Sequence, residues 1–205
     1  MVIEVAQFIF ILLFSVVLHE CSHGWVALKC GDPTAKISGR LTLNPLKHID
    51  LIGTIIVPTV LRLMGYMPFG WAKAVPVNFS LLRNPKRDMI WVALAGPAMN
   101  LFLAVVCSTL LKFSMGSVFL VRFFSLGIFI NILLAVFNLT PIPPLDGSRI
   151  VMGVLPDQLA RKYRQLEPFG IIIVLVLVNV GLLGYILPLI LFMAMLLGVN
   201  ADMLM

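Results

Sequence analysis

Long apolar stretches alternate along the chain with shorter segments that are polar, basic or rich in proline. Two of the apolar stretches contain no charged residue: Met89–Leu111, with 23 residues, and Phe169–Val199, with 31. About 20 helical residues cross the hydrocarbon core of a bilayer, so both stretches predict membrane helices. Gly181, Gly184 and Pro188 predict a break in the longer one, with one helix before it and a shorter or re-entrant helix after it.

Two further apolar stretches predict helices at residues 3–29 and 118–139. The first of them has Glu4 in place of a basic leading region and no small-residue cleavage site, so we interpret it as a retained helix rather than a signal peptide. The whole chain is 60% hydrophobic and 12% charged, with a mean hydropathy of +1.06, and so has too few charges to cover a soluble domain. The sequence therefore predicts a polytopic α-helical membrane protein of about four to six membrane segments. We expect residues 1–205 to form a single membrane-embedded domain.

The region after the first helix, residues 32–80, predicts a different arrangement. Ala35–Leu43 alternates in polarity as a β-strand does, which predicts a strand edge that could capture a peptide. The 14 residues of Leu51–Met64 are apolar but short for a span, and Gly53 and Pro58 interrupt them. Basic residues lie on both sides of this stretch. Because basic loops stay in the cytoplasm, we expect a partly embedded re-entrant region that contains β structure.

Charge and cysteine content exclude other classes of protein. The formal net charge of +6 fits basic loops between membrane helices, and we expect no binding to nucleic acid. The three cysteines contain no CxxC pair, which excludes a disulfide framework. The same basic loops orient the chain, with the N-terminus outside and the polar segments around residues 19–23, 140–148 and 157–167 toward the cytoplasm.

A metal-binding motif lies near the end of the first predicted helix. His19, Glu20 and His23 form an HExxH sequence, in which the two histidines share one face of a helix and the glutamate can move a proton. Ionisable side chains inside a membrane are costly unless they bind metal, form pairs or line a cavity. The motif therefore predicts a zinc site.

A catalytic zinc ion usually has a third protein ligand, and the spacing of the residues leaves its identity open. His48 is the remaining histidine, but its basic loop favours a surface or interfacial position. Asp146 follows three prolines in the loop of residues 140–148 and precedes Gly147. Spacing alone favours an ordinary turn aspartate there.

Three segments of the sequence resemble the signatures of the site-2 protease family of intramembrane metalloproteases. They are His19–His23, Gly96–Asn100 and Asn138–Gly147, in the family's order, and the resemblance covers residues 15–150. The segments Gly70–Asn78 and Leu166–Gly170 resemble the small prokaryotic branch of that family.

The resemblance implies a role for each matching residue. His19, His23 and Asp146 would hold one Zn²⁺ per chain, and Glu20 would be the general base. Asn100 and Asn138 would hold the substrate backbone or stabilise the transition state. The alternative for each asparagine is a hydrogen bond between helices.

The resemblance also implies the function. We expect a zinc metalloendopeptidase that cuts membrane-protein substrates in or near their transmembrane segments, as in regulated intramembrane proteolysis. It would lie in the lipid bilayer of a prokaryotic plasma membrane, with its active site toward the cytoplasmic side. A longest extramembrane stretch of 57 residues leaves no room for a PDZ or nucleotide-sensing domain. Substrate choice would then come from the membrane region or a regulatory membrane partner, and the oligomeric state stays open.

Two alternatives remain from the residues alone. A catalytically silent zinc-binding membrane scaffold would explain the metal motif, and so, less well, would a zinc transporter. The presence of Glu20 together with all three candidate ligands favours the protease over both.

Overall fold

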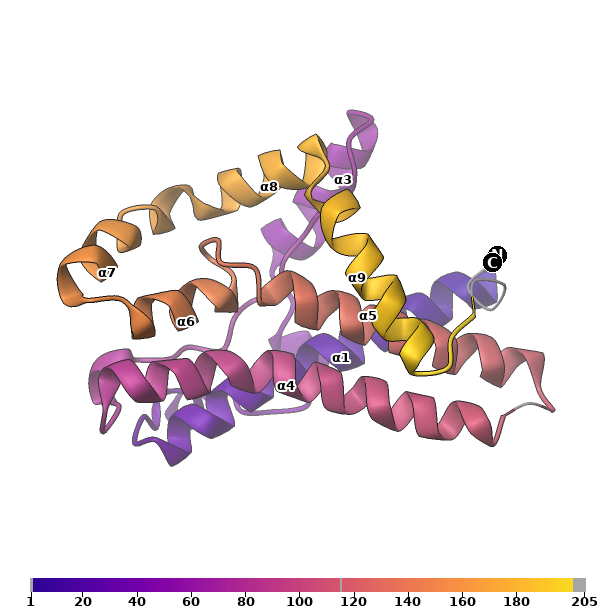
Figure 1. Cartoon of the computed structure of the whole chain (residues 1–205), viewed down its shortest axis with the longest axis horizontal. Helices are drawn as coiled ribbons and strands as arrows, with labels where there is room; N and C mark the ends of the chain where they lie inside the picture. Colours follow the sequence, from indigo (N-terminus) through magenta and orange to yellow (C-terminus); the bar gives the residue numbers. More distant parts are fainter. Residues whose placement is uncertain (1, 115, 201–205) are drawn as a thin grey trace.

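The computed structural model describes residues 2–114 and 116–200, which form helices joined by turns and extended segments (Figure 1). The elements are, in chain order, α1 (Val2–Lys29), α2 (Thr34–Ile37), η1 (Pro45–Lys47), η2 (Leu51–Ile56), α3 (Val57–Leu63), η3 (Phe79–Leu81), α4 (Pro85–Lys112), α5 (Val118–Asn138), α6 (Asp146–Val154), α7 (Asp157–Arg164), η4 (Glu167–Phe169), α8 (Gly170–Val180) and α9 (Leu182–Leu196).

Within the part of the chain that the structure describes, four helical segments are long and apolar enough, by length and composition, to cross a membrane. They are Val2–Lys29, Pro85–Lys112, Val118–Asn138 and Asp157–Val180. Leu51–Leu63 and Leu182–Leu196 are shorter apolar helices. The predicted helical architecture with several candidate membrane segments is therefore confirmed.

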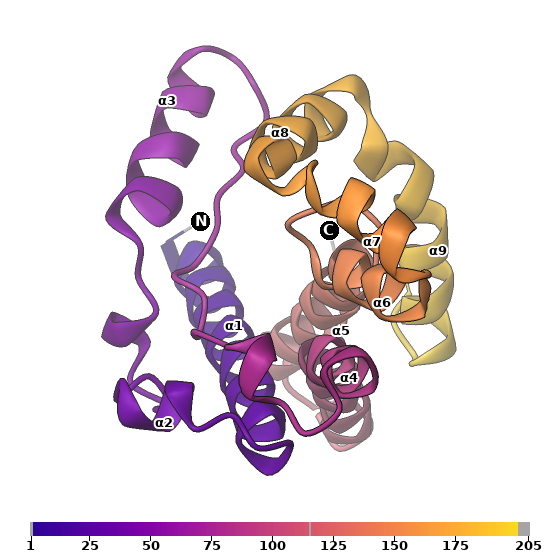
Figure 2. The same ribbon diagram turned by 90° about the vertical axis from the view of Figure 1, so that its left-hand side faces the viewer.

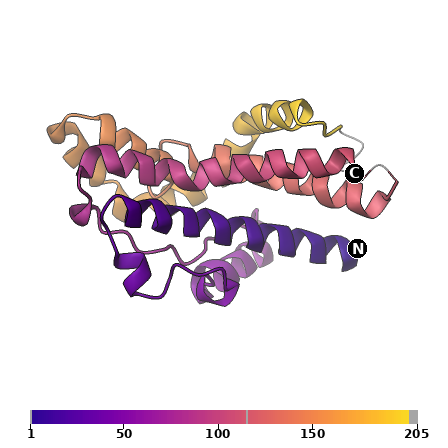
Figure 3. The same cartoon turned by 90° about the horizontal axis from the view of Figure 1, so that it is seen from below.

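Helix α4 is the centre of the bundle. It packs against α1, α5 and α6, and α1 and α4 run side by side in Figures 1 and 3. Pro85 at the first turn of α4 and the Ser117 side chain at the start of α5 fix where these two helices begin.

Of the three apolar clusters in the described residues, two hold this bundle together. One cluster joins α4, α5 and α9, and its buried members are Ala104, Leu111, Ile128, Ile132, Ile190, Ala194 and Val199. The other lies between α1, α4 and α6, and its buried members are Ala27, Leu82, Met89, Val92 and Met152. The second cluster joins the end of α6 to the last turn of α1 and the first turns of α4.

The predicted strand at Ala35–Leu43 is wrong, and the described residues contain no strand. Asp32, which is fully buried, accepts hydrogen bonds from the backbone N–H of Thr34 and from its hydroxyl, and so starts a helical turn. The turn continues as α2 and ends at Gly39, whose φ is 64°. Alternating polarity alone could not show that no partner strand would lie beside this segment.

The short apolar segment after η1 folds back on itself. The Asp50 side chain caps its start by accepting from Gly53 N at 2.7 Å, and η2 and α3 follow. The chain then returns in an extended conformation, in which Trp71 N donates to the Gly53 carbonyl and Lys73 N to the His48 carbonyl. His48 and Lys73, which flank the whole excursion of the chain, are therefore neighbours. Helix α3, at the far end of this excursion, stands apart from the bundle in Figure 2.

The last apolar stretch breaks where glycine predicted it. Helix α8 ends at Gly181, whose φ of 114° favours glycine, and α9 follows at once in a new direction (Figure 1). With 15 residues, α9 is too short to cross a bilayer as a straight helix.

Candidate metal centre

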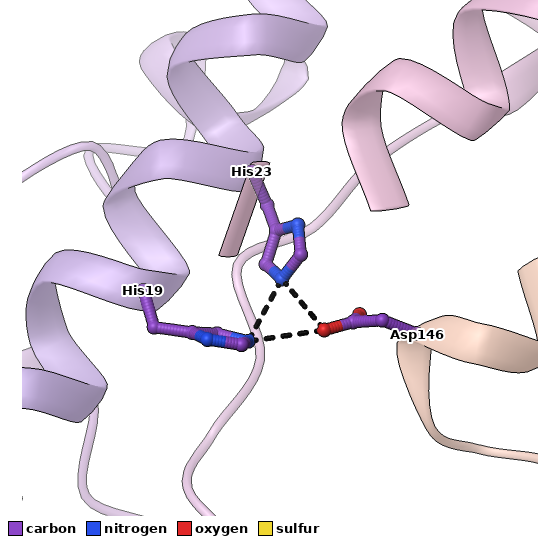
Figure 4. A group of neighbouring side chains, drawn as sticks. All are labelled: His19, His23 and Asp146. Atoms are coloured by element: carbon purple, nitrogen blue, oxygen red, sulfur yellow. Dashed lines mark hydrogen bonds and ion pairs between the residues drawn. The ribbon is translucent and has the colours of Figure 1, made fainter. Parts of the chain in front are cut away.

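Three candidate ligands from two distant parts of the chain meet at one point (Figure 4). His19 and His23 lie one turn apart on α1, and Asp146 is the first residue of α6. The two Nε2 atoms are 3.0 Å apart, and they lie 3.1 Å and 3.3 Å from Asp146 Oδ2. The structure therefore brings together the three ligands that the resemblance implies, all of which are mostly buried.

The Nδ1 atom of each imidazole, which points away from the cluster, faces a hydrogen-bond acceptor. His23 Nδ1 lies 2.6 Å from the Val92 carbonyl oxygen, and His19 Nδ1 lies 2.5 Å from Asn100 Oδ1. In a neutral imidazole, a proton on Nδ1 leaves a lone pair on Nε2. Such partners on the outer nitrogen orient metal-binding histidines generally. Both Nε2 atoms therefore face the centre of the cluster as acceptors.

The third ligand adds a negative charge at the same point. Asp146 Oδ2 is buried and has no partner with hydrogen-bond geometry in the described part of the chain. Two imidazole lone pairs and a carboxylate oxygen that converge in this way need a cation between them.

The dimensions of the cluster fit zinc. Tetrahedral ligands at 2.0–2.1 Å from Zn²⁺ are about 3.3 Å from one another. The three observed separations, 3.0, 3.1 and 3.3 Å, lie close to that value. Two imidazoles and one carboxylate are also a ligand set typical of catalytic zinc, which leaves a coordination position open.

Two glycines of the motifs make room for this centre. A Cβ atom on Gly96 would lie 2.5 Å from His19 Nε2 and 2.4 Å from His23 Nε2. A Cβ atom on Gly147 would lie 2.2 Å from the Leu139 carbonyl oxygen. Gly96 therefore lets α4 approach the imidazoles, and Gly147 lets the ligand loop close against the end of α5.

Glu20 lies beside the cluster and is held by the returning extended segment. Its Oε2 accepts a hydrogen bond from Val75 N at 2.8 Å. The same extended segment is fixed further along by Asn78 N, which donates to the buried Asp32 carboxylate at 2.6 Å. The residues after η2 and α3 thus orient the candidate base.

A cavity of about 640 Å³ opens onto the ligands. Its walls come from α1, the extended segment, α4, α5, the ligand loop and α8. The polar and charged side chains among its lining residues are His19, Glu20, His23, Asp50, Lys73, Asn138, Asp146 and Arg149. This volume lies within the range of about 300–1,000 Å³ that is typical of ligand pockets.

The structure places the two predicted asparagines differently. Asn138 lines the cavity, and its Nδ2 donates to the Leu134 carbonyl at 2.9 Å. Asn100 is fully buried, contacts His19 and donates to Asn131 Oδ1. Of the two, Asn138 is thus the one that lines the cavity.

His48 is not at the surface, contrary to the sequence-based expectation. Its side chain is 3% exposed, and Nε2 lies 2.8 Å from the Thr42 carbonyl oxygen. Within residues 2–114 and 116–200, the only cluster with the geometry of a metal site consists of His19, His23 and Asp146.

Three contributors to the site were missed by the sequence analysis. The Val92 carbonyl and the Val75 N–H belong to the backbone, so no side-chain motif could have indicated them. The sequence could have indicated Asn131, because a polar amide inside an apolar helix is costly without a hydrogen-bond partner. Its partner, Asn100, could not be deduced from spacing.

Comparisons with known proteins identify the family to which the chain is similar. The sequence profile of peptidase family M50 matches residues 7–120 and 115–180. "Putative zinc metalloprotease YwhC" of Bacillus subtilis is 41% identical over 188 residues, which are 86% of this chain and 81% of that protein. "Putative zinc metalloprotease Rip2" of Mycolicibacterium smegmatis is 33% identical over 80% of this chain and 63% of that protein.

A more distant relative has an archaeal origin. "Zinc metalloprotease MJ0392" of Methanocaldococcus jannaschii is 28% identical over 78% of this chain, but over 36% of its own length. The chain therefore spans most of the Bacillus protein and less than two thirds of the other two. No solved structure matches the chain.

Proposed function

The chain belongs to peptidase family M50 and is a zinc metalloprotease, and from this premise we propose that it hydrolyses peptide bonds in or near the transmembrane segments of other membrane proteins. The observation that carries the proposal is the position of the cluster of His19, His23 and Asp146. Two of its three residues lie on a helix long and apolar enough to span a bilayer, and it opens onto a cavity of about 640 Å³.

The proposed ligands are His19, His23 and Asp146, which would hold one zinc ion. A bound zinc ion supplies Lewis acidity, which activates water and polarises a carbonyl oxygen. Glu20 is the proposed general base. Its carboxylate takes a proton from the attacking water as the new C–O bond forms, and it returns a proton to the amide nitrogen as the C–N bond breaks.

The hydrogen bond from Val75 N supports this role for Glu20. It occupies Oε2 and fixes the direction of the carboxylate, so that the other oxygen remains free to accept the proton. A positioned base needs no reorientation during the reaction, which lowers the barrier.

Asn138 is the proposed contact to the substrate backbone. One amide hydrogen of Asn138 is used by the Leu134 carbonyl, so its oxygen and second hydrogen can pair with an extended peptide. A helical substrate hides its carbonyls in hydrogen bonds four residues away, so it must unwind locally before it pairs in this way.

We also propose that the segment Leu51–Leu63 enters the membrane and returns on the same side. The hydrogen bond between Lys73 N and the His48 carbonyl supports this path, because a crossing segment would separate its ends by about 30 Å. The active site would then face the cytoplasm of a prokaryotic cell, where regulated intramembrane proteolysis would release a cytoplasmic product. Membership of the family favours a protease over the silent scaffold and the transporter.

A cleavage assay tests the proposal. Purified protein in detergent is incubated with a panel of single-span membrane proteins, with and without a zinc chelator, and the products are sequenced by mass spectrometry. We expect cuts within or at the edge of the transmembrane segment that disappear with the chelator and return with added zinc. Zinc-dependent cuts confined to soluble domains would show a metalloprotease that does not act in the membrane.

A further inference from the structure

A chain of buried amides extends from one proposed zinc ligand across two neighbouring helices. His19 Nδ1 lies 2.5 Å from Asn100 Oδ1 on α4, and Asn100 Nδ2 donates to Asn131 Oδ1 on α5 at 2.9 Å. Asn131 Nδ2 then donates to the Gly127 carbonyl at 2.9 Å. Asn100 is fully buried and Asn131 is 2% exposed. This chain, which we call the amide relay, links α1, α4 and α5 away from water.

The last acceptor fixes the direction of every bond in the amide relay. A backbone carbonyl can only accept, so Asn131 must turn its Nδ2 toward Gly127 and its Oδ1 toward Asn100. Asn100 must then present Nδ2 to Asn131 and Oδ1 to His19. Reversing either amide would place two donors or two acceptors against each other, which is costly in a buried site.

The direction of the relay determines where the proton of His19 resides. Because His19 Nδ1 faces an acceptor oxygen, Nδ1 carries the proton and Nε2 keeps the lone pair. Nε2 is the atom that lies 3.0 Å from His23 Nε2 and 3.1 Å from Asp146 Oδ2. The relay therefore selects the tautomer that can bind a metal.

We infer that Asn131 is a positioning residue of the metal centre, which acts through Asn100 to hold His19 in its metal-binding tautomer. The inference rests on the proposed function, in which His19 binds zinc. His23 needs no such relay, because the Val92 carbonyl beside its Nδ1 is itself only an acceptor. One ligand is thus oriented by the backbone and the other by two replaceable side chains.

A packing role for Asn131 would give a different outcome on substitution. Leucine has the same branched arrangement of side-chain heavy atoms, although it is larger, and it suits a membrane helix, so a packing role alone would leave the His19 tautomer unchanged in Asn131→Leu. Without Asn131 Oδ1, however, the amide of Asn100 is free to turn and present Nδ2 to His19. This would move the His19 proton to Nε2, where it competes with zinc. Loss of such an outer partner typically weakens metal binding by about 10–100-fold.

The test measures zinc affinity and the His19 tautomer on the full-length protein in detergent. The zinc dissociation constant comes from competition with a chromophoric chelator, and the tautomer from imidazole ¹⁵N chemical shifts of the zinc-free protein at pH 8. With only three histidines in the chain, the spectrum can be assigned. We expect Asn131→Leu to bind zinc about 10–100-fold more weakly and to shift the His19 proton toward Nε2.

Two further variants make the result specific. Asn131→Asp keeps an oxygen that accepts from Asn100, and its protonated form can donate to Gly127, so zinc affinity and tautomer should stay near those of the wild type. Asn179→Leu is the matched control on α8. It removes the same kind of amide, which donates to the Leu175 carbonyl at 2.8 Å and accepts from Met67 N at 3.3 Å, and neither of these partners is bonded to a zinc-binding histidine.

The outcomes separate this inference from the proposed function. Wild-type protein that binds no zinc would overturn both. Wild-type protein that binds one zinc, with Asn131→Leu equal to it in affinity and His19 tautomer, would overturn the relay alone. An equal loss in Asn131→Asp and Asn131→Leu would also overturn the relay, because the loss would then not depend on the acceptor. If Asn131→Leu does not fold, Asn131→Ala takes its place and the same comparisons decide.

Discussion

At the scale of single residues, the role of Asp146 is determined by the two histidines that the fold places beside its side chain. In the sequence, an aspartate between prolines and glycine is an ordinary turn residue. In the structure, the same carboxylate is 3.1 Å and 3.3 Å from two imidazole nitrogens that are 127 and 123 residues away in the chain (146 − 19 and 146 − 23). The resemblance implied this contact, whereas local spacing could not.

Replacing Asp146 tests whether it is the third ligand. Asp146→Ala removes the only carboxylate in the cluster, so zinc affinity should fall by more than the roughly 100-fold that an outer partner costs. His48→Gln is the control, because a glutamine can still donate to the Thr42 carbonyl and His48 lies outside the cluster. Zinc per chain is measured by mass spectrometry of the metal. Full zinc in Asp146→Ala together with loss in His48→Gln would reassign the third ligand.

Glu20 can be tested separately from metal binding. Glu20→Gln keeps an oxygen that can accept from Val75 N but cannot take a proton, so zinc content should remain at one per chain. The cleavage rate should fall by about 10²–10⁴-fold, which is the usual contribution of a general base. Glu4→Gln at the opposite end of α1 is the matched control and should cleave normally, since Glu4 pairs with Arg122 there. Normal turnover in Glu20→Gln would exclude it as the base.

At the scale of elements, the apolar runs predicted the helices because a membrane helix needs little beyond length and hydrophobicity. The break at Gly181 could be predicted for the same reason, since glycine readily adopts a φ of 114°. The strand at Ala35–Leu43 could not be judged from its own residues. A strand needs a partner, and the buried Asp32 carboxylate instead starts a helical turn at Thr34.

The metal centre depends on how closely α1 and α4 approach each other. A Cβ atom on Gly96 would meet both Nε2 atoms at 2.5 Å or less, so Gly96→Ala should displace the imidazoles and lower zinc content. The matched control is Gly184→Ala on α9, where a Cβ atom would meet nothing within 4 Å. Both variants are purified by size exclusion, and zinc per folded chain is compared. Full zinc in a folded Gly96→Ala variant would show that the two helices can separate without disturbing the ligands.

At the scale of the whole molecule, contacts between elements bring several groups of basic residues to one end of the bundle. Lys86 pairs with Asp157 at 2.7 Å, which places the start of α4 beside α7 and its basic residues. The backbone bond from Arg83 N to the Cys30 carbonyl joins the same end to the end of α1. Because basic residues near membrane helices stay in the cytoplasm, this end should face inward.

Cysteine labelling tests this orientation together with the re-entrant path. Single cysteines replace Lys47, Lys73 and Arg161, all exposed, in a background that lacks Cys21, Cys30 and Cys107. We expect a membrane-impermeant reagent to label all three only after the membrane is permeabilised.

Phe113→Cys is the control for the opposite end, because Phe113 follows α4 and is 85% exposed. It should react in intact cells. Labelling at position 73 from outside, with position 47 protected, would mean that Leu51–Leu63 crosses the membrane. That result would conflict with the hydrogen bond between Lys73 N and the His48 carbonyl, since a crossing segment could not bring its two ends together.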